Sequence, residues 1–302
     1  MIYDVIVIGG GPSGMSACIY ALRSGKSVLI LEKENFGGQI ANSPRVENFP
    51  TIKEISGLEL SDKLFNQILD LGAEFELEDV KEVNKLSNGN FEVKTNYGVH
   101  EGKKVIIANG VSHRMLNLPN EVDLVGKGIS FCAVCDGSFY KGQDTYLIGD
   151  GNTALQYALL LSNSSNHVYV FTLCDKFFGD KILQDRVKAK DNIIVTHNMS
   201  LVEYKGTDEL TGLVFENTKT KERTEFKTNN IFVAIGQIPH NEMFQDLVDL
   251  ERGYIVTDEN MMTKTNGVYA IGDTRKKTIR QVITACNDGA IAALHAVSQI
   301  AD

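Results

Sequence analysis

The first apolar run of the chain is short, rich in β-branched residues and followed by a cluster of glycines. Residues 3–8 form this run, and it stops at the glycine-rich stretch 9–14. Residues 15–24 then have the apolar spacing of a helix, and a second apolar run covers 27–31. The succession predicts a strand, a helix and a second strand, which together form a βαβ unit of about thirty residues.

The same succession returns 140 residues later. An apolar run at 145–148 leads into a second glycine-rich turn, a helical pattern and a predicted strand at 167–171. Two further runs, 105–110 and 231–236, are strand patterns that end in glycine. Each is expected to be the last strand of a sheet before the chain crosses to the other domain.

After the second crossing, the chain is expected to return to the first domain. A strand pattern ends at Gly272-Asp273, and a long amphipathic helix pattern runs from about Gln281 to Ile300. At roughly 150 residues per domain, a chain of 302 residues also suggests two domains. We therefore predict an α/β fold with two Rossmann-like nucleotide-binding domains of the three-layer ββα type, the second inserted into the first. The predicted boundaries are 1–112 with 245–302 for one domain and 113–244 for the other.

Composition and charge narrow the functional classes. Hydrophobic residues make up 43% of the chain and charged residues 23%, which is ordinary for a globular protein. The net charge is −9 and no long basic block occurs, so nucleic-acid binding is disfavoured. The first residues lack the pattern of a signal peptide, and no stretch approaches the ~20 apolar residues of a membrane span. We expect a cytoplasmic protein that binds neither nucleic acid nor membrane.

The first glycine-rich turn has the spacing of a dinucleotide-binding motif. Gly9-x-Gly11-x-x-Gly14 follows a predicted strand and opens a predicted helix, so its glycines allow a tight turn and close approach of a pyrophosphate. Glu32 ends the next strand, 23 residues after Gly9, where an acid can bind ribose hydroxyls. The motif and the acid together predict a bound dinucleotide.

The second turn has the same shape with two departures. It is Gly149-x-Gly151-x-x-Ala154, but Asp150 places a carboxylate where a diphosphate would lie. The position that matches Glu32 is Thr172, which is neither an acid nor an arginine. The sequence supports no strong selectivity for NADPH, and a nucleotide fold that binds little nucleotide stays open as an alternative.

A Cys-x-x-Cys pair lies between the two turns. Cys132 and Cys135 are the only close pair among five cysteines, and no nearby histidine completes a metal site, so we expect a redox dithiol and no metal. Thiol–disulfide exchange needs a thiolate and a proton donor, and Asp136 is the adjacent candidate acid. The alternative, a pair of buried structural thiols, is less favoured in this context.

With these motifs in order, the chain resembles the low-molecular-weight thioredoxin reductases, which are two-domain FAD and pyridine-nucleotide disulfide reductases. The likeness covers essentially the full length. The matching segments are 9–14, 37–39, 46–50, 132–137, 149–154, 234–239, 272–273 and 280–282.

The resemblance implies FAD on the discontinuous first domain and an NAD(P)-binding-like second domain that carries the cysteine pair. It also implies that Cys135 faces the flavin, that Cys132 attacks the partner disulfide, that Asp136 serves as acid and base, and that the protein is a homodimer. The FAD residues implied by motif match are Gly9, Gly11, Pro12, Ser13, Gly14, Glu32, Gly38, Gln39, Asn48, Asp273, Arg280, Gln281 and Val282. The corresponding NAD(P) residues are Gly149, Gly151, Asn152, Thr153 and Ala154.

One segment departs from the family pattern. The family usually carries His-Arg-Arg-x-x-x-Arg to grip the 2′-phosphate of NADPH, whereas residues 172–178 here are Thr-Leu-Cys-Asp-Lys-Phe-Phe. Every basic position of that pattern is lost. The donor is therefore left open between NADPH, NADH and reduced ferredoxin or another donor that is not a pyridine nucleotide.

The leading hypothesis is a flavoenzyme that passes electrons through FAD to Cys132–Cys135 and on to thioredoxin or a similar small protein. The alternatives keep the dithiol and change the donor to ferredoxin, or reverse the chemistry to a flavin-dependent dithiol oxidase. A redox sensor without catalytic turnover is the alternative from a different functional class.

Overall fold

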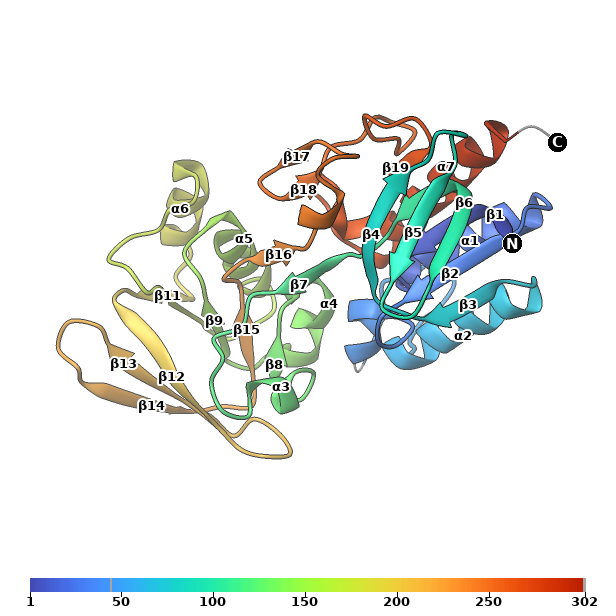
Figure 1. Cartoon of the computed structure of the whole chain (residues 1–302). Coiled ribbons are helices and arrows are strands. Elements are labelled where there is room, and N and C mark those ends of the chain that lie inside the picture. The colour runs from blue at the N-terminus through green and yellow to red at the C-terminus, as the bar shows by residue number, and fades with distance from the viewer. Residues whose placement is uncertain (44, 301–302) are drawn as a thin grey trace. The chain divides into compact units, whose positions relative to one another are not determined.

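The structure is a computed structural model that describes residues 1–43 and 45–300. The chain divides into two compact units (Figure 1). Residues 1–112 and 238–302 form the first unit, and residues 113–237 form the second. The second unit is therefore inserted into the first.

The first unit is built on a parallel sheet that continues into an antiparallel ribbon. Its strands follow the order β3-β2-β1-β6-β5-β4, and β19 pairs with the end of β6. Strands β3, β2, β1, β6 and β19 are parallel neighbours, whereas β4, β5 and the first half of β6 pair antiparallel. The bounds are β1 Ile2–Ile8, β2 Val28–Glu32, β3 Glu74–Leu77, β4 Val80–Lys85, β5 Phe91–Thr95, β6 Val99–Ile107 and β19 Val268–Ala270.

Alternating side chains of the parallel strands bury both faces of this sheet, as expected for strands that read as continuous apolar runs. Val5 and Val7 pack into a core with helices α1 (Pro12–Arg23), α2 (Gly57–Asp70) and α7 (Val282–Ser298). Ile6 and Ile8 point the other way, into a core with the antiparallel strands. The first unit thus has three layers, with helices, a parallel sheet and an antiparallel ribbon.

The second unit repeats this plan. Its parallel sheet has the order β11-β10-β9-β15-β8, and a separate antiparallel sheet has the order β12-β13-β14. Leu147 packs with helices α5 (Asn152–Leu161) and α6 (Lys181–Lys188), whereas Tyr146 and Ile148 pack with the antiparallel strands. The bounds are β8 Ile129–Ser130, β9 Thr145–Ile148, β10 Val168–Phe171, β11 Ile193–Thr196, β12 Met199–Lys205, β13 Gly212–Asn217, β14 Arg223–Lys227 and β15 Ile231–Val233.

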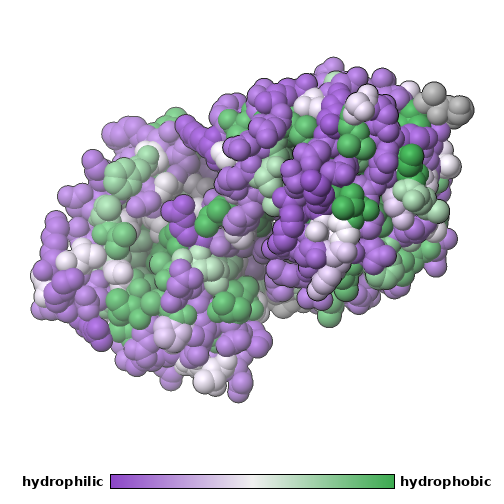
Figure 2. All heavy atoms as spheres, viewed as in Figure 1, coloured by the Kyte–Doolittle hydropathy of each residue, from purple (hydrophilic) through white to green (hydrophobic). Residues whose placement is uncertain are grey.

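Short elements complete the chain. These are η1 Gly38–Asn42, β7 Val111–His113, α3 Glu121–Leu124, α4 Ala133–Asp136, η2 Gly137–Tyr140, β16 Gln237–Pro239, η3 Glu242–Phe244, β17 Leu250–Glu251, β18 Tyr254–Ile255 and η4 Gly272–Thr274. On the face that Figure 2 shows, hydrophilic residues predominate and hydrophobic residues lie between them. None of the helices in the described ranges is both long and apolar enough to span a membrane.

The predicted fold class is confirmed, with two Rossmann-like units of three layers each and the second inserted into the first. The second crossing lies between Gln237 and Ile238, whereas the expected boundary was 244/245. Residues 238–244 belong with the first unit because Phe244 is fully buried in its core and the Asn241 amide donates to the carbonyls of Gly253 and Thr274. Which cofactor each unit holds stays a prediction at this point.

Candidate active site

The loop between β1 and α1 needs its glycines for two different reasons. Gly9 has φ 113°, and a Cβ there would lie 2.4 Å from the Ala108 carbonyl oxygen of the neighbouring strand. A Cβ at Gly14 would lie 2.0 Å from the carbonyl oxygen of Gly9, so helix and loop pack in backbone contact. A Cβ at Gly11 would meet no described atom within 4 Å. Gly9 and Gly14 are therefore required by packing, while Gly11 leaves open space beside the start of the helix.

The N-terminus of α1 has the features of an anion-binding site. Gly11 is the N-cap and has no side chain, Pro12 occupies the first turn, and the first turn contains no acidic residue. The first N–H groups of a helix lack partners within the helix and carry a partial positive charge. A diphosphate placed over Gly11 would satisfy them.

Glu32 lies at the end of β2 and contacts the same loop. Its Oε2 accepts a hydrogen bond from the Gly10 N–H at 2.7 Å, and its Oε1 accepts one from the Glu34 N–H at 2.9 Å. Each carboxylate oxygen retains a further lone pair for a hydroxyl donor. The position therefore fits a ribose, with the carboxylate also fixing the loop.

The second glycine pair packs on the first. The Gly37 N–H donates to the Gly10 carbonyl at 2.8 Å, and a Cβ at Gly38 would lie 3.4 Å from the Cα of Gly11. The Gln39 amide follows in η1 and donates to the carbonyl of Val111 at 3.4 Å. The structure thus brings segment 37–39 against the glycine-rich loop, 26 residues away in sequence when counted from Gly11 to Gly37.

Asp273 reaches the site from the opposite end of the chain. It lies in η4 directly after Gly272, whose Cβ position would be 2.6 Å from the Ser13 hydroxyl oxygen. The Asp273 Oδ1 is buried and has no hydrogen-bond partner among the described residues. Burial raises the pKa of this carboxyl, and the charges of Lys277 and Arg280 partly offset that effect. A buried acceptor without a donor is costly, so the atom calls for a ligand hydroxyl or amide.

Four further predicted residues, Asn48, Arg280, Gln281 and Val282, complete the group. The Arg280 Nε donates to the Asp273 carbonyl at 3.5 Å, and its guanidinium lies 4.4 Å from the centre of the Tyr254 ring. Gln281 caps α7, and its side-chain oxygen accepts a hydrogen bond from the Asn48 amide at 3.2 Å. Val282 begins α7 and packs against the small apolar cluster around Val46.

The first unit therefore gathers all thirteen residues expected for FAD into one connected region. The open side of Gly11, the uncapped helix and the unpaired Asp273 Oδ1 are what a dinucleotide with a polyhydroxyl chain would fill. The residues of this region therefore fit a bound FAD.

The cysteine pair in the second unit forms a disulfide. Cys132 is the N-cap of α4, its Cα lies 5.2 Å from that of Cys135, and both side chains are half-buried. The Cys135 N–H donates to the Cys132 Sγ at 3.2 Å. An N–H aimed at a sulfur favours its thiolate form, so this contact lowers the cost of a thiolate at Cys132 after reduction.

A buried network adjoins the disulfide. The Ser130 hydroxyl donates to the Asp136 Oδ2 at 2.6 Å and accepts from the Cys132 N–H at 3.1 Å. The Asp136 Oδ1 is buried and has no partner in the described part of the chain. Burial raises the pKa of Asp136, and the Ser130 hydrogen bond lowers it in part. A carboxyl with a raised pKa can hold a proton for transfer.

Sequence reasoning missed the residues around this network. Burial, followed by the negative charge of Asp136, raises the pKa values of Tyr140 and Tyr157. The His113 ring stacks on Phe131 at 4.4 Å between centres, and burial lowers the pKa of His113 to about 4. Ser130 was detectable as a hydroxyl two residues before Cys132. No spacing rule connects the other residues to the cysteine pair.

The second glycine-rich loop repeats the geometry of the first. Gly149 has φ 145°, and its Cβ position would lie 2.5 Å from the Ala234 carbonyl oxygen and 2.8 Å from the Ala154 Cβ. The Cβ position of Gly151 is open to 4 Å among the described atoms, and Thr153 is exposed. Asn152 is engaged, because its side chain accepts from the Asp180 N–H at 2.6 Å and donates to the Asp180 carboxylate at 3.0 Å.

The position that matches Glu32 offers nothing to a ribose. Thr172 is fully buried, and its hydroxyl pairs with the Cys174 carbonyl at 2.7 Å and with the His197 Nδ1 at 2.6 Å. Lys176 lies 5.5 Å from the centre of the Phe178 ring. The exposed Leu173 and Phe178 occupy positions that carry arginine in the family pattern. Thr172, Leu173 and Phe178 therefore offer no charged group to a ribose hydroxyl or to a 2′-phosphate.

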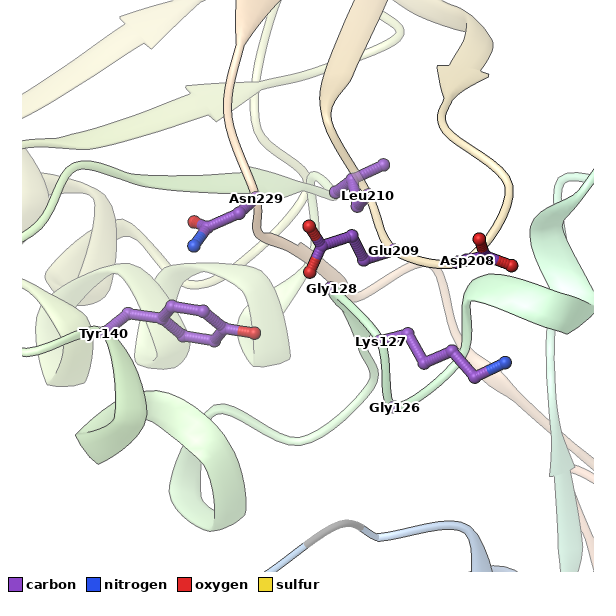
Figure 3. Close-up of a pocket in the computed structure, with 8 residues that line it drawn as sticks. All are labelled: Gly126, Lys127, Gly128, Tyr140, Asp208, Glu209, Leu210 and Asn229. Atoms are coloured by element: carbon purple, nitrogen blue, oxygen red, sulfur yellow. The ribbon is translucent and has the colours of Figure 1, made fainter.

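A cavity of about 320 Å³ lies elsewhere on the second unit. Figure 3 shows the Tyr140 and Glu209 side chains pointing toward its middle, while Lys127 extends away from it. None of the predicted cofactor residues lines this cavity. Among the described residues, no cluster of three histidine, cysteine or acidic side chains could hold a metal ion.

Comparisons with known proteins agree with this geometry. The family described as pyridine nucleotide-disulphide oxidoreductase matches residues 3–289. A thioredoxin reductase of Bacillus subtilis is 38% identical over 97% of this chain and 93% of its own length. A 34.2 kDa protein in the rubredoxin operon of Clostridium pasteurianum is also 38% identical, over 98% of this chain and 97% of its own.

Solved structures extend the likeness to the fold. The thioredoxin reductase of Streptococcus pyogenes is 36% identical and has a TM-score of 0.93, with 98% of this chain and 97% of that chain covered. The glycine-rich loops and the disulfide thus occur in a chain that is similar, over nearly its full length, to proteins named as thioredoxin reductases. The chain belongs to the pyridine nucleotide-disulphide oxidoreductase family and is an FAD-dependent disulfide reductase of the low-molecular-weight thioredoxin reductase type.

Proposed function

We propose that the protein takes electrons from a reduced pyridine nucleotide and delivers them through the Cys132–Cys135 pair to the disulfide of a thioredoxin. The observation that carries the proposal is the disulfide itself, which has the half-buried Asp136 beside it and lies in the same chain as the group of residues that fits a flavin dinucleotide. The names of the full-length relatives support thioredoxin as the partner. They also favour the reductase over the dithiol oxidase.

In this proposal the first unit binds and orients FAD. The N-terminus of α1 would hold the diphosphate, Glu32 a ribose hydroxyl, and Asp273 a further hydroxyl of the cofactor. FAD supplies the two-electron chemistry that returns the disulfide to the dithiol.

The dithiol then reduces the partner in two exchange steps. The Cys132 thiolate attacks one sulfur of the partner disulfide, a mixed disulfide forms, and the leaving sulfur takes a proton for which Asp136 is the nearest candidate donor. Cys135 next attacks the Cys132 Sγ, which breaks the mixed disulfide, releases the second partner thiol and restores the internal disulfide. The Cys135 N–H aimed at the Cys132 Sγ supports Cys132 as the attacking group.

The decisive test is the Cys135→Ser variant, assayed for thioredoxin reduction and for flavin content. Turnover should fall to background, because the internal disulfide cannot form, while the yellow flavin stays bound in the first unit. Cys174→Ser is the matched control, since Cys174 is a partly exposed free cysteine of the same unit and should be dispensable. Undiminished turnover in Cys135→Ser would overturn the proposed route.

For the donor, we propose that the second unit discriminates weakly between NADH and NADPH. No arginine lies between residues 172 and 178, and the fully buried Thr172 replaces the ribose-binding acid. The kcat/KM values for the two nucleotides should then lie within about tenfold of each other, since discrimination by a 2′-phosphate needs charged hydrogen bonds.

Anaerobic reduction of the flavin by each nucleotide measures this ratio, and a Leu173→Arg/Phe178→Arg variant adds back two basic positions on exposed sites. The variant should gain preference for NADPH. Flavin that neither nucleotide reduces, but reduced ferredoxin does, would reject the pyridine-nucleotide donor.

Two further expectations remain predictions. A homodimer is the family's arrangement, and sedimentation equilibrium of the purified flavoprotein tests it directly. A cytoplasmic location also stays a prediction, which fractionation of the source cells would check.

A further inference from the structure

A buried ionic cluster lies in the first unit, outside the residues assigned to FAD. Asp288 on α7 has a side chain only 5% exposed, and its Oδ2 accepts hydrogen bonds from the Lys277 Nζ at 2.9 Å and the Arg275 Nε at 3.2 Å. The Lys277 side chain is 8% exposed. Removing such charges from water costs several kcal/mol per ion unless they are closely paired, so a cluster of this kind calls for an explanation.

The cluster is attached to the turn that carries Asp273. The same Asp288 Oδ2 accepts a third hydrogen bond, from the Gly272 N–H at 3.1 Å. Gly272 has φ 72° and leaves no room for a Cβ next to Ser13. Backbone conformation, packing on α1 and the bond to Asp288 therefore fix the residue immediately before Asp273.

The cluster also acts on Asp273 through charge. Lys277 and Arg280 lower the pKa of the Asp273 carboxyl, whereas burial and Asp288 raise it. Lys277 thus interacts with both carboxylates at once. Without Lys277, each acid would keep one cation, Arg275 beside Asp288 and Arg280 near Asp273, and the repulsion between the two carboxylates would be less offset.

We propose that Asp288 and Lys277 are positioning residues for the flavin. Asp288 holds the Gly272–Asp273 turn so that the unpaired Asp273 Oδ1 faces the cofactor, and Lys277 balances the two carboxylates. The inference rests on the proposed FAD site and adds to it a charge pair that sets both the affinity for flavin and its reduction potential.

The experiment replaces each member of the pair without changing its size greatly, using Asp288→Asn and Lys277→Gln. Flavin release from the holoenzyme is followed by the gain of FAD fluorescence on dilution, and the midpoint potential of the bound flavin by anaerobic dye equilibration. We expect the dissociation constant to rise about tenfold in Asp288→Asn, which corresponds to loss of one charge-assisted hydrogen bond.

The midpoint potentials of the flavin in the two variants show whether Asp288 and Lys277 act through their charge or only through packing. Asp288→Asn removes a negative charge, which favours the reduced flavin and should raise the potential. Lys277→Gln removes a positive charge and should lower it. Loosened packing alone gives no reason for shifts of opposite sign.

Glu121→Gln is the matched control. Glu121 is a carboxylate of the second unit, 1% exposed, that accepts hydrogen bonds from the Leu116 and Leu118 N–H groups and the Tyr204 hydroxyl. This variant should lower thermal stability but leave flavin affinity and potential unchanged.

Two failures are distinguishable. If the unmodified protein binds no flavin, the proposed function itself fails. If it binds flavin and both variants keep its affinity and potential, the positioning role is overturned. Should Asp288→Asn not fold, Lys277→Gln still decides the question, because an unchanged potential in that variant contradicts the proposal.

Discussion

Asp136 has a raised pKa because it is buried beside the disulfide with one hydroxyl donor and one unpaired oxygen. Since the folded protein then binds this proton more tightly than the unfolded chain, the free energy of unfolding falls as pH rises through the folded pKa. The carboxyl therefore lowers stability at neutral pH. A group that costs stability and adjoins a redox disulfide is a candidate for proton transfer.

Asp136→Asn should accordingly be more stable than the unmodified protein at pH 7 to 8, with the difference vanishing below the unfolded pKa of about 3.9. Thermal unfolding of the oxidised proteins across this pH range measures the effect. Turnover with thioredoxin should fall about a hundredfold or more, as for loss of a general acid. A variant that is less stable at pH 8 and more stable at pH 5 would contradict the assignment of the buried acid.

Ser130→Ala tests the one hydrogen bond that lowers the pKa of Asp136. Its loss should raise that pKa further, so the pH–rate profile for thioredoxin reduction should shift to higher pH. Ser165→Ala is the control, because Ser165 is another buried serine of the second unit, bonded to the Thr145 hydroxyl and remote in sequence from the disulfide. It should cost a similar ~1 kcal/mol of stability without moving the profile. Equal profiles in both variants would remove Ser130 from the proton-transfer network.

Among the elements, the start of α1 serves both folding and binding. Gly14 is in backbone contact with Gly9, whereas Gly11 faces open space in a conformation that alanine adopts readily. The two glycines of one motif therefore have different tasks. Gly14 permits the helix to pack on the loop, and Gly11 leaves room for the ligand.

Gly14→Ala and Gly11→Ala should separate these tasks. Gly14→Ala should lower the free energy of unfolding by about 1–3 kcal/mol or prevent folding, because the added methyl overlaps a backbone oxygen. Gly11→Ala should leave the unfolding of the flavin-free protein unchanged and weaken FAD binding. Chemical denaturation and FAD fluorescence measure the two quantities, and a stability loss in Gly11→Ala as large as in Gly14→Ala would contradict this division.

At the scale of the whole molecule, each unit has its own helix-side and ribbon-side cores. The first unit buries two large clusters on the two faces of its sheet, and so does the second. Each unit is also long enough to form an independent core. The units are therefore expected to unfold separately, with FAD bound to only one of them.

Differential scanning calorimetry with increasing free FAD should show two transitions, of which one moves upward. A ligand at a hundred times its dissociation constant stabilises the unit that binds it by about 2.7 kcal/mol. No spectroscopic probe is needed, because the calorimeter detects the heat absorbed in each transition directly. Coincident transitions that shift together would show that the two units unfold as one.

Local elements and local chemistry were predictable from the order of the residues. Alternation of apolar runs with glycine turns predicted β1, α1, β2 and their counterparts β9, α5 and β10, because strands buried on both faces and helices beside glycine loops need those residue types in that order. The redox pair and its neighbouring acid were equally local, being contiguous at 132–136. The flavin residues are spread over the chain, and only the resemblance to a known family predicted them together, because no periodicity relates Gly11 to Asp273.

Contacts between segments far apart in the chain became known only from the folded structure. It places Gly272 on Ser13, pairs Asp288 with Lys277, and leaves the Asp273 Oδ1 buried without a partner among the described residues. It also ends the inserted unit at Gln237, because Phe244 and Asn241 are held by core contacts and hydrogen bonds of the first unit that no local pattern encodes. Burial and pairing depend on which distant segments meet, and that is a property of the folded chain.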